Sequence, residues 1–327
     1  MVTSRDVARA AGVSQATVSR VLTSANPVSA ELRERVLAAV DLVGYVPHAA
    51  ARTMKTGRTG AIGAVVDDLA SNPFYPELLQ ELSDAFDDLG QRLTVWTAGS
   101  RSDAAIRSLR QGLVDGVVFT TVTPTSTEFA SAVDSRLPLV LINRTLDDVD
   151  CDQISTDNVA GGALVADRFA AAGRRPAFIG GPADASTSRQ RLTGFRARLT
   201  ELGAALPPAP WEIGDYTHDS AYRAMQRIIA EDAADAVFCA NDVVAVGALD
   251  AAREVGARVP DDLWIIGYDD IALASWTSID LSTVRQDARR MARDGARMLL
   301  ERIRSPSSPV QHVRLEPELV TRGTSGR

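Results

Sequence analysis

The stretch TSRDVARAAGVSQATVSRVL, residues 3–22, decides the fold of the first part of the chain. Its apolar residues recur at three- and four-residue spacing on both sides of Gly12, which predicts two short helices joined by a tight turn. Thr3 is expected to cap the first helix, with Asp6 completing a variant of the capping box. Ser14 is a favourable cap for the second helix. The stretch therefore predicts a helix-turn-helix.

A third helix is expected to complete this head. Ser29 can cap a helix that runs to Val43 with apolar residues four positions apart, and Gly44 can end it. Residues 46–60 show no regular spacing of apolar side chains, and any helix among them is too short to be stable alone. We therefore expect a helix-turn-helix domain at 1–46, followed by a hinge helix and linker at 47–60.

From residue 61 the pattern changes to an alternation of strands and helices. Short apolar runs predict strands at 61–66, 93–97, 116–121, 137–142, 177–179, 236–239 and 264–267. Amphipathic stretches predict helices near 76–89, 103–111, 126–135, 158–172, 189–202, 218–231, 242–255 and 286–303. This order indicates an α/β core with parallel sheets covered by helices.

The α/β part, residues 61–327, is too long for one comfortable unit, so we expect two lobes. The first lobe is expected at about 61–156 and 286–305. The second is expected at about 157–285 and 306–327. The chain would then cross between the lobes more than once.

Charge is distributed unevenly along the chain. The whole chain carries −7, whereas residues 1–58 hold eight Arg or Lys and four Asp or Glu, a net +4. A basic head on an acidic body suits a segment that meets phosphates and a body that stays away from them.

Several classes of protein are excluded by what the sequence lacks. Its two cysteines have no CxxC spacing, which argues against a disulfide framework and a zinc site. No apolar run approaches the roughly 20 residues of a membrane helix, and the N-terminus does not resemble a signal peptide. We expect a cytoplasmic protein with no membrane partner. His48, His218 and His312 are far apart, and no familiar catalytic motif is present. No catalytic residue, metal or cofactor is predicted.

Residues suited to contact DNA gather in the head. A helix that enters the major groove needs small polar residues at its start and long hydrogen-bonding side chains to reach base edges. Gln15 and Arg20 have that reach. Hydroxyls that can bind phosphate are supplied by Thr3, Ser14, Thr17, Ser19 and Ser29. Alternatively, Ser14 and Ser29 serve only as helix caps and Arg20 is a solvated surface charge.

The stretches DVARAAGVSQATVSRVL and VSAELRERVLAAVDLVGYVPHAAARTMKTGRTGAIGAVV resemble the lactose-repressor (LacI/GalR) family of bacterial regulators, and the resemblance runs through the whole chain. It implies a core like that of type I periplasmic binding proteins. It also implies a hinge helix whose apolar side chain wedges into the minor groove. Met54 stands at the position where the family has leucine, and Ala51 lies three residues before it in the same hinge segment. In the head, Gln15 and Ala16 match family positions that vary with the operator sequence. A buried helix contact is the alternative role for Met54.

Polar and aromatic residues follow the predicted strands, where ligands bind in open α/β sheets. The candidate effector-binding residues are Asn72, Phe74, Arg144, Arg191, Tyr216, Asn241, Asp269 and Gln286. RLTGF, residues 191–195, resembles the family's Arg-x-x-Gly-Phe motif. By that resemblance, Arg191 and Asp269 would bind hydroxyls or ring heteroatoms. Alternatively, Asn72 and Asn241 only cap helices and Asp269 only makes a turn.

Together these features predict a sequence-specific transcription regulator, expected to be a repressor, whose affinity for its operator depends on a small molecule. The charged and amide groups favour a sugar or sugar derivative, with a purine or nucleoside as the alternative. A two-lobed solute-binding protein without DNA function is the rival class. The sequence ends at 319–327 without a leucine-rich helix. We therefore expect a homodimer on a near-palindromic, double-stranded DNA operator.

Overall fold

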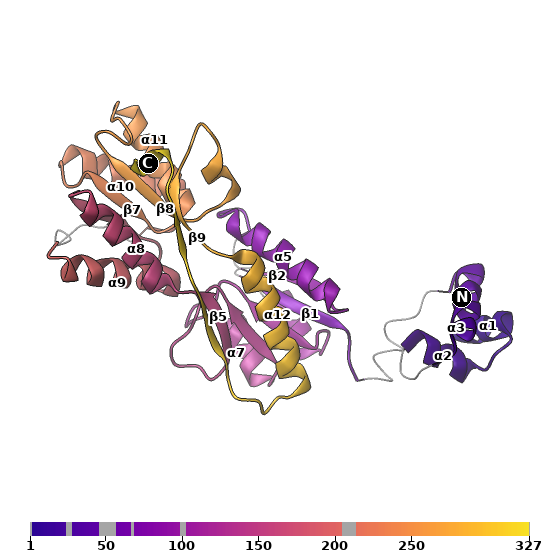
Figure 1. The fold of residues 1–327 in the computed structure, drawn as a ribbon. Coiled ribbons are helices and arrows are strands. Elements are labelled where there is room, and N and C mark those ends of the chain that lie inside the picture. The colour runs from indigo at the N-terminus through magenta and orange to yellow at the C-terminus, as the bar shows by residue number, and fades with distance from the viewer. Residues whose placement is uncertain are drawn as a thin grey trace. The chain divides into compact units, whose positions relative to one another are not determined.

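The structure is a computed structural model that describes residues 2–23, 28–45, 57–66, 69–98, 103–204 and 214–326. It forms two compact units, residues 1–59 and 60–327, which are described separately (Figure 1). Ala51 and Met54, for which a DNA-contacting role is predicted, lie outside the described residues, as does most of the expected hinge.

The first unit contains the predicted helix-turn-helix. Its helices are α1 (Ser4–Ala11), α2 (Gln15–Thr23) and α3 (Ala30–Val43). Gly12 and Gly44 follow α1 and α3 with φ of 62° and 63°, a left-handed conformation that favours glycine. One fully buried valine from each helix, Val7, Val18 and Val36, forms the centre of the core.

The second unit is built on two sheets. The six-stranded sheet has the order β10-β5-β4-β3-β1-β2 and is parallel throughout. Its strands are β1 (Ala61–Val66), β2 (Arg92–Thr97), β3 (Gly116–Phe119), β4 (Leu139–Ile142), β5 (Asp152–Thr156) and β10 (His312–Leu315). The five-stranded sheet has the order β11-β9-β8-β7-β6, with only β11 antiparallel. Its strands are β6 (Pro176–Ile179), β7 (Ala236–Cys239), β8 (Trp264–Asp269), β9 (Ser282–Arg285) and β11 (Glu318–Val320).

Helices cover both faces of each sheet, as the alternating pattern predicts. Around the six-stranded sheet lie α5 (Phe74–Asp88), α6 (Asp103–Arg110), α7 (Thr127–Asp134) and α12 (Ala288–Arg304). Around the five-stranded sheet lie α8 (Asn158–Ala171), α9 (Ser186–Glu201), α10 (His218–Ala230) and α11 (Asp242–Glu254). Each sheet with its helices is one lobe, and each lobe has two apolar clusters, one on each face of its sheet. No helix among the described residues is long and apolar enough to span a membrane.

The chain crosses between the lobes three times: from β5 to α8, from β9 to α12, and from β10 to β11. The last crossing lies later than the expected boundary at 305, because β10 pairs with β5 and stays in the first lobe. Arg302 and the backbone N–H of Gln311 both donate to the carboxylate of Asp152 in β5, which fixes this return.

Close packing of α8 on α9 depends on two glycines. A side chain at Gly194 would overlap the carbonyl oxygen of Val159, and one at Gly162 would overlap that of Arg191. The two helices therefore approach each other through their backbones. Since α9 carries Arg191, this contact sets the position of that arginine.

Aromatic rings fill the cluster beneath α8 and α9. Phe178, Phe195 and Phe238 are almost fully buried, and Tyr268 of β8 lies beside them. The hydroxyl of Tyr268 is buried and makes no hydrogen bond with any described residue. Burial raises the pKa of this phenol well above its ordinary value. Burying this hydroxyl without a hydrogen-bond partner destabilises the folded state.

We predict that Gly194→Ala lowers the free energy of unfolding by about 2 kcal/mol or more, because the added methyl group forces α8 and α9 apart. The exposed Thr193→Ala change on the same helix is the matched control and should cost less than about 0.5 kcal/mol. Urea unfolding followed by circular dichroism measures both. Equal stability of the two variants would contradict the packing argument.

We predict that Tyr268→Phe leaves the free energy of unfolding unchanged or raises it by up to about 1 kcal/mol, because it removes an unpartnered buried hydroxyl and keeps the ring. Tyr268→Leu should lower it by about 2 kcal/mol, since the ring beneath Arg191 is lost. The same urea titration compares them. A large loss in the phenylalanine variant would show that the hydroxyl has a partner in solution.

Candidate functional sites

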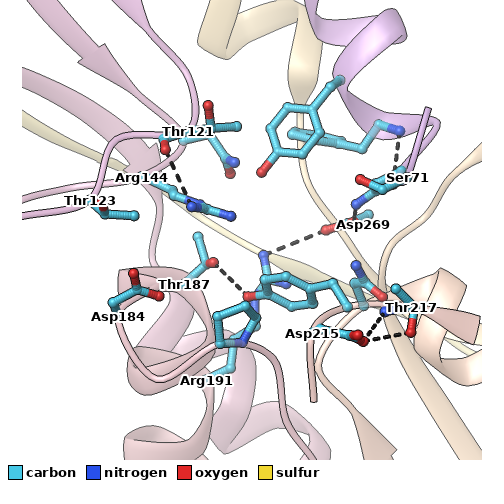
Figure 2. Close-up of a pocket in the computed structure, with 17 residues that line it drawn as sticks. Ser71, Thr121, Thr123, Arg144, Asp184, Thr187, Arg191, Asp215, Thr217 and Asp269 are labelled. Atoms are coloured by element: carbon cyan, nitrogen blue, oxygen red, sulfur yellow. Dashed lines mark hydrogen bonds and ion pairs between the residues drawn. The ribbon is translucent and has the colours of Figure 1, made fainter. Parts of the chain in front are cut away.

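A cavity of about 410 Å³ lies between the two lobes of the second unit. This volume falls within the 300–1,000 Å³ or so that is typical of small-molecule sites. Its walls come from segments that follow β1, β3 and β4 in the first lobe and β6, β7 and β8 in the second. Figure 2 shows side chains from both lobes pointing towards one another across the space.

Most of the residues proposed to bind the effector line this one cavity. They are Asn72, Phe74, Arg144, Arg191, Tyr216, Asn241 and Asp269. They come from seven positions spread over about 200 residues of sequence, and the fold brings them together at the carboxyl ends of the strands.

Arg191 is buried and held from several directions. Its Nε donates to Oδ1 of Asn158 at 2.8 Å, and Nη1 donates to the carbonyl of Ala240. Nη2 lies 3.5 Å from Oδ1 of Asp269, and the guanidinium carbon lies 3.6 Å from the ring centre of Tyr268. A guanidinium has five N–H donors, so this arrangement leaves donors for a ligand while fixing the group in place.

Asp269 ends β8 and joins parts of both lobes. Its Oδ2 accepts a 2.8 Å hydrogen bond from Nδ2 of Asn72 in the first lobe, and its Oδ1 accepts one of 2.8 Å from Nε2 of Gln286. Burial raises the pKa of Asp269, while Arg191 and the two amide donors oppose that rise. The carboxylate is therefore oriented by three partners before any ligand is present.

Gln286 differs from its prediction as an effector contact. It is not among the residues that line the cavity. Its Oε1 accepts a 2.8 Å hydrogen bond from the hydroxyl of Thr156, and its Nε2 is used by Asp269. Gln286 therefore lies behind Asp269 and orients that carboxylate, because both ends of its amide are already engaged by protein groups.

Two asparagines combine capping with exposure to the cavity. Oδ1 of Asn72 accepts from the backbone N–H of Phe74 at 3.0 Å, and Oδ1 of Asn241 accepts from that of Val244 at 2.9 Å. The capping role considered for both residues is thus present. It does not replace contact with a ligand, because both also line the cavity.

On the first-lobe wall, Asn143 and Arg144 follow β4. Nη1 of Arg144 donates to the carbonyl of Thr121 at 3.3 Å. Asn143 has a left-handed φ of 73°, is 4% exposed, and its Oδ1 accepts no hydrogen bond from the described residues. A buried amide oxygen without a donor is costly unless a ligand or water supplies one.

Tyr216 is the aromatic wall of the second lobe. Its backbone is left-handed, with φ of 65°, and its hydroxyl lies 3.0 Å from that of Thr187. The ring packs so closely on Gly181 that any side chain there would overlap it. Next to it, a hydrogen bond from Thr217 lowers the pKa of Asp215 to about 2, so this carboxylate is charged.

Further residues of the cavity were not chosen from the sequence: Ser71, Tyr75, Thr121, Thr123, Asn143, Pro182, Asp184, Thr187, Asp215 and Thr217. Asn143 directly follows β4, which was the available signal for it, whereas Thr121 was assigned to the end of a predicted strand that is shorter in the structure. Most of these residues have small or common polar side chains that did not distinguish them from ordinary turn residues, while Tyr75 lies in the first turn of α5 and resembles a core residue.

In the head, the residues proposed to contact DNA are accessible. Ser14, just before α2, is exposed, as are Gln15, Ala16 and Arg20 on the helix, while Val18 on its inner side is buried. Thr17 and Ser19 are half-exposed, and Thr3 and Ser29 are exposed.

Capping, the alternative considered for two of the serines, is present in the head. The hydroxyl of Ser14 accepts from the backbone N–H of Thr17 at 3.1 Å. The hydroxyl of Ser29 accepts a hydrogen bond from the backbone N–H of Leu32 at 3.3 Å. A capping hydroxyl at a helix N-terminus keeps lone pairs and a proton that a phosphate group can still engage.

Two family models match the chain. Residues 3–48 match "Bacterial regulatory proteins, lacI family", and residues 166–325 match "Periplasmic binding protein-like domain". The first covers the helix-turn-helix, and the second covers most of the second lobe and the final crossings.

Curated relatives and solved structures extend this similarity over the whole chain. The ribose operon repressor of Escherichia coli (strain K12) is 33% identical over 332 residues, covering 99% of this chain and 100% of that protein. The transcriptional repressor PurR of Photobacterium profundum is 33% identical over 98% of both chains.

Among solved structures, a complex of the transcriptional regulator CelR with cellobiose has a TM-score of 0.77 at 30% identity, covering 99% of this chain and 100% of that one. The lac repressor dimer bound to operator and the anti-inducer ONPF has a TM-score of 0.85 at 27% identity, covering 100% and 99%. These relatives are transcription regulators, not enzymes. With its helix-turn-helix head and its two-lobed core, this chain belongs to the LacI family of bacterial transcription regulators.

Proposed function

We propose that the protein is a homodimeric repressor that binds a near-palindromic DNA operator, and that a sugar or sugar derivative in the cavity between the lobes sets its operator affinity. The main support for a sugar as effector is that polar side chains gather beside the ring of Tyr216 in one cavity. They are those of Arg191, Asp269, Asn143 and Asn241. Because operator DNA lies in the bacterial cytoplasm, the protein acts there.

A sugar matches the chemistry of these groups. Each hydroxyl of a sugar both donates and accepts a hydrogen bond, so it can bridge a guanidinium donor and a carboxylate acceptor such as those of Arg191 and Asp269. The C–H face of a sugar ring can pack on an aromatic ring, which Tyr216 presents in a fixed orientation. One relative is named for ribose, and one similar structure contains cellobiose.

The mechanism that fits this architecture is a population shift. A ligand that contacts both walls of the cavity binds a closed arrangement of the lobes more tightly than an open one. In a dimer, the resulting change in the first lobes would alter the spacing of the two heads. The change in operator affinity is limited by the difference in ligand affinity between the two arrangements.

The first test is a selection of fragmented DNA from the protein's own genome at near-physiological salt, where non-specific phosphate binding is weak. Enrichment of near-palindromes would support the proposal, and the selection is repeated with ribose, cellobiose, adenosine and hypoxanthine in case a corepressor is needed. The same compounds are compared by calorimetry. A purine that binds where all sugars fail would replace the proposed effector class.

We predict that Arg191→Ala reduces affinity for the identified effector by about 100-fold or more, because a charge-assisted hydrogen bond to the ligand is lost from a buried site. Binding to operator DNA should remain within about twofold. The control is Arg196→Ala, an exposed arginine on the same helix. Calorimetry measures the ligand, fluorescence anisotropy the operator, and thermal unfolding confirms that Arg191→Ala is folded. Unchanged effector affinity would remove Arg191 from the site.

We predict that Met54→Ala weakens operator binding by about 10-fold or more, because unstacking a base step costs a few kcal/mol and the apolar wedge is the side chain that would offset this cost. Effector affinity should not change. Leu42→Ala, which removes an apolar side chain that is 81% exposed on α3, is the control. Normal operator affinity in Met54→Ala, measured by anisotropy, would show that Met54 is not the wedge.

A further inference from the structure

The first residues of two helices in the head are joined by a side-chain hydrogen bond. Nε2 of Gln15, which begins α2, donates to the hydroxyl oxygen of Ser4, which begins α1, at 2.8 Å. Gln15 is exposed and Ser4 is half-exposed. The buried valines Val7 and Val18 hold the two helices together, so the two N-termini keep this separation.

This contact changes what the glutamine can offer a partner. A free glutamine amide has two N–H donors on Nε2 and an acceptor oxygen Oε1. The hydroxyl of Ser4 uses one of the two N–H groups of Gln15. What remains is one N–H donor beside one acceptor, in an orientation fixed by the same hydrogen bond.

The two purines differ in what they require from such an amide. In the major groove, adenine presents the N7 acceptor and the N6 amino donor, whereas guanine presents two acceptors, N7 and O6. An amide with one donor and one acceptor pairs with both groups of adenine. To serve both acceptors of guanine, Nε2 would have to give up the Ser4 hydroxyl or rotate away from it.

We propose that Ser4 is a positioning residue that makes Gln15 select adenine over guanine at one base pair of each half-site. This inference rests on the proposed function, in which Gln15 faces the major groove. Specificity at that base pair then depends on two helices, because the group that contacts the base lies on α2 and the group that orients it lies on α1.

Arg20 provides a contrast within the same helix. Its Nη2 lies 3.4 Å from the hydroxyl of Thr17, which itself lies 2.9 Å from that of Ser14. A guanidinium has only donors, and one hydrogen bond to the Thr17 hydroxyl leaves several of them free. Arg20 can therefore still donate to both acceptors of guanine. The effect of a neighbouring hydroxyl on purine choice is therefore specific to the amide of Gln15.

The experiment uses the full chain and the operator found by genomic selection, with all four base pairs placed symmetrically at each half-site position. Dissociation constants are measured for the wild type, Ser4→Ala, Gln15→Ala, the double variant, and Ser4→Thr, which keeps the hydroxyl. The wild type should prefer adenine over guanine about 10-fold or more at one position, in line with one bidentate base contact.

Ser4→Ala should reduce this ratio several-fold at that position and leave the preferences at other positions and the salt dependence unchanged. Gln15→Ala should abolish the ratio, and the double variant should equal Gln15→Ala, as expected for two residues acting through one contact. Ser4→Thr should retain the adenine preference. Thermal unfolding verifies that every variant is folded.

Three results would overturn the inference. The adenine preference could survive Ser4→Ala, Gln15 could specify a base other than adenine, or Ser4→Ala could still alter preference in the Gln15→Ala background, which would mean that Ser4 contacts DNA itself. Failure to enrich any operator, with or without added sugars and purines, is a different outcome. It overturns the proposed function and this inference with it.

Discussion

The cavity between the lobes is organised around one buried ion pair, Arg191 with Asp269. Charges placed in a protein interior destabilise it unless they are paired and hydrogen-bonded, and here each partner is held by further groups. Asn158 and Tyr268 hold the arginine, while Asn72 and Gln286 hold the carboxylate. Because Asn72 belongs to the first lobe and Gln286 to a crossing segment, the pair is also a point of contact between the lobes. Its geometry therefore depends on how the lobes are arranged, which is what a ligand-responsive group requires.

Much of the fold could be predicted from local patterns. Helix caps such as Ser29 and left-handed glycines such as Gly44 lie where the sequence indicates, because they depend on a few neighbouring residues. The strands β5, β9, β10 and β11 were missed, since runs such as DQIST and HVRL mix polar and apolar residues. Their identity as strands comes from pairing with segments far away in sequence. The same reason explains the misplaced last crossing, because β10 is recognised only by its partner β5.

The candidate site shows the same division. Arg191 could be chosen from the sequence because it begins the RLTGF motif, and Asp269 because it closely follows a predicted strand. Asn143 also follows a predicted strand, but nothing in the sequence separates it from ordinary turn residues, and Thr187 carries no signal at all. Their importance lies in a buried amide oxygen without a donor and in a hydroxyl contact, which only the folded chain reveals. Gln286 shows the opposite error, since a correct position next to the site does not determine which way an amide faces. In the head, the contact between Gln15 and Ser4 joins residues eleven positions apart and was likewise invisible to periodicity.

The three crossings between the lobes have a mechanical consequence. Two bodies joined by one flexible segment can twist, slide and separate, whereas three chain segments at the same junction remove most of those degrees of freedom. For the lobe closure proposed above, opening and closing is the motion that three such segments restrict least. Ligands of quite different chemistry would then drive the same motion, provided that they favour the same end of it. The side chains that choose the ligand can consequently change during evolution without a matching change in the part of the molecule that transmits the response.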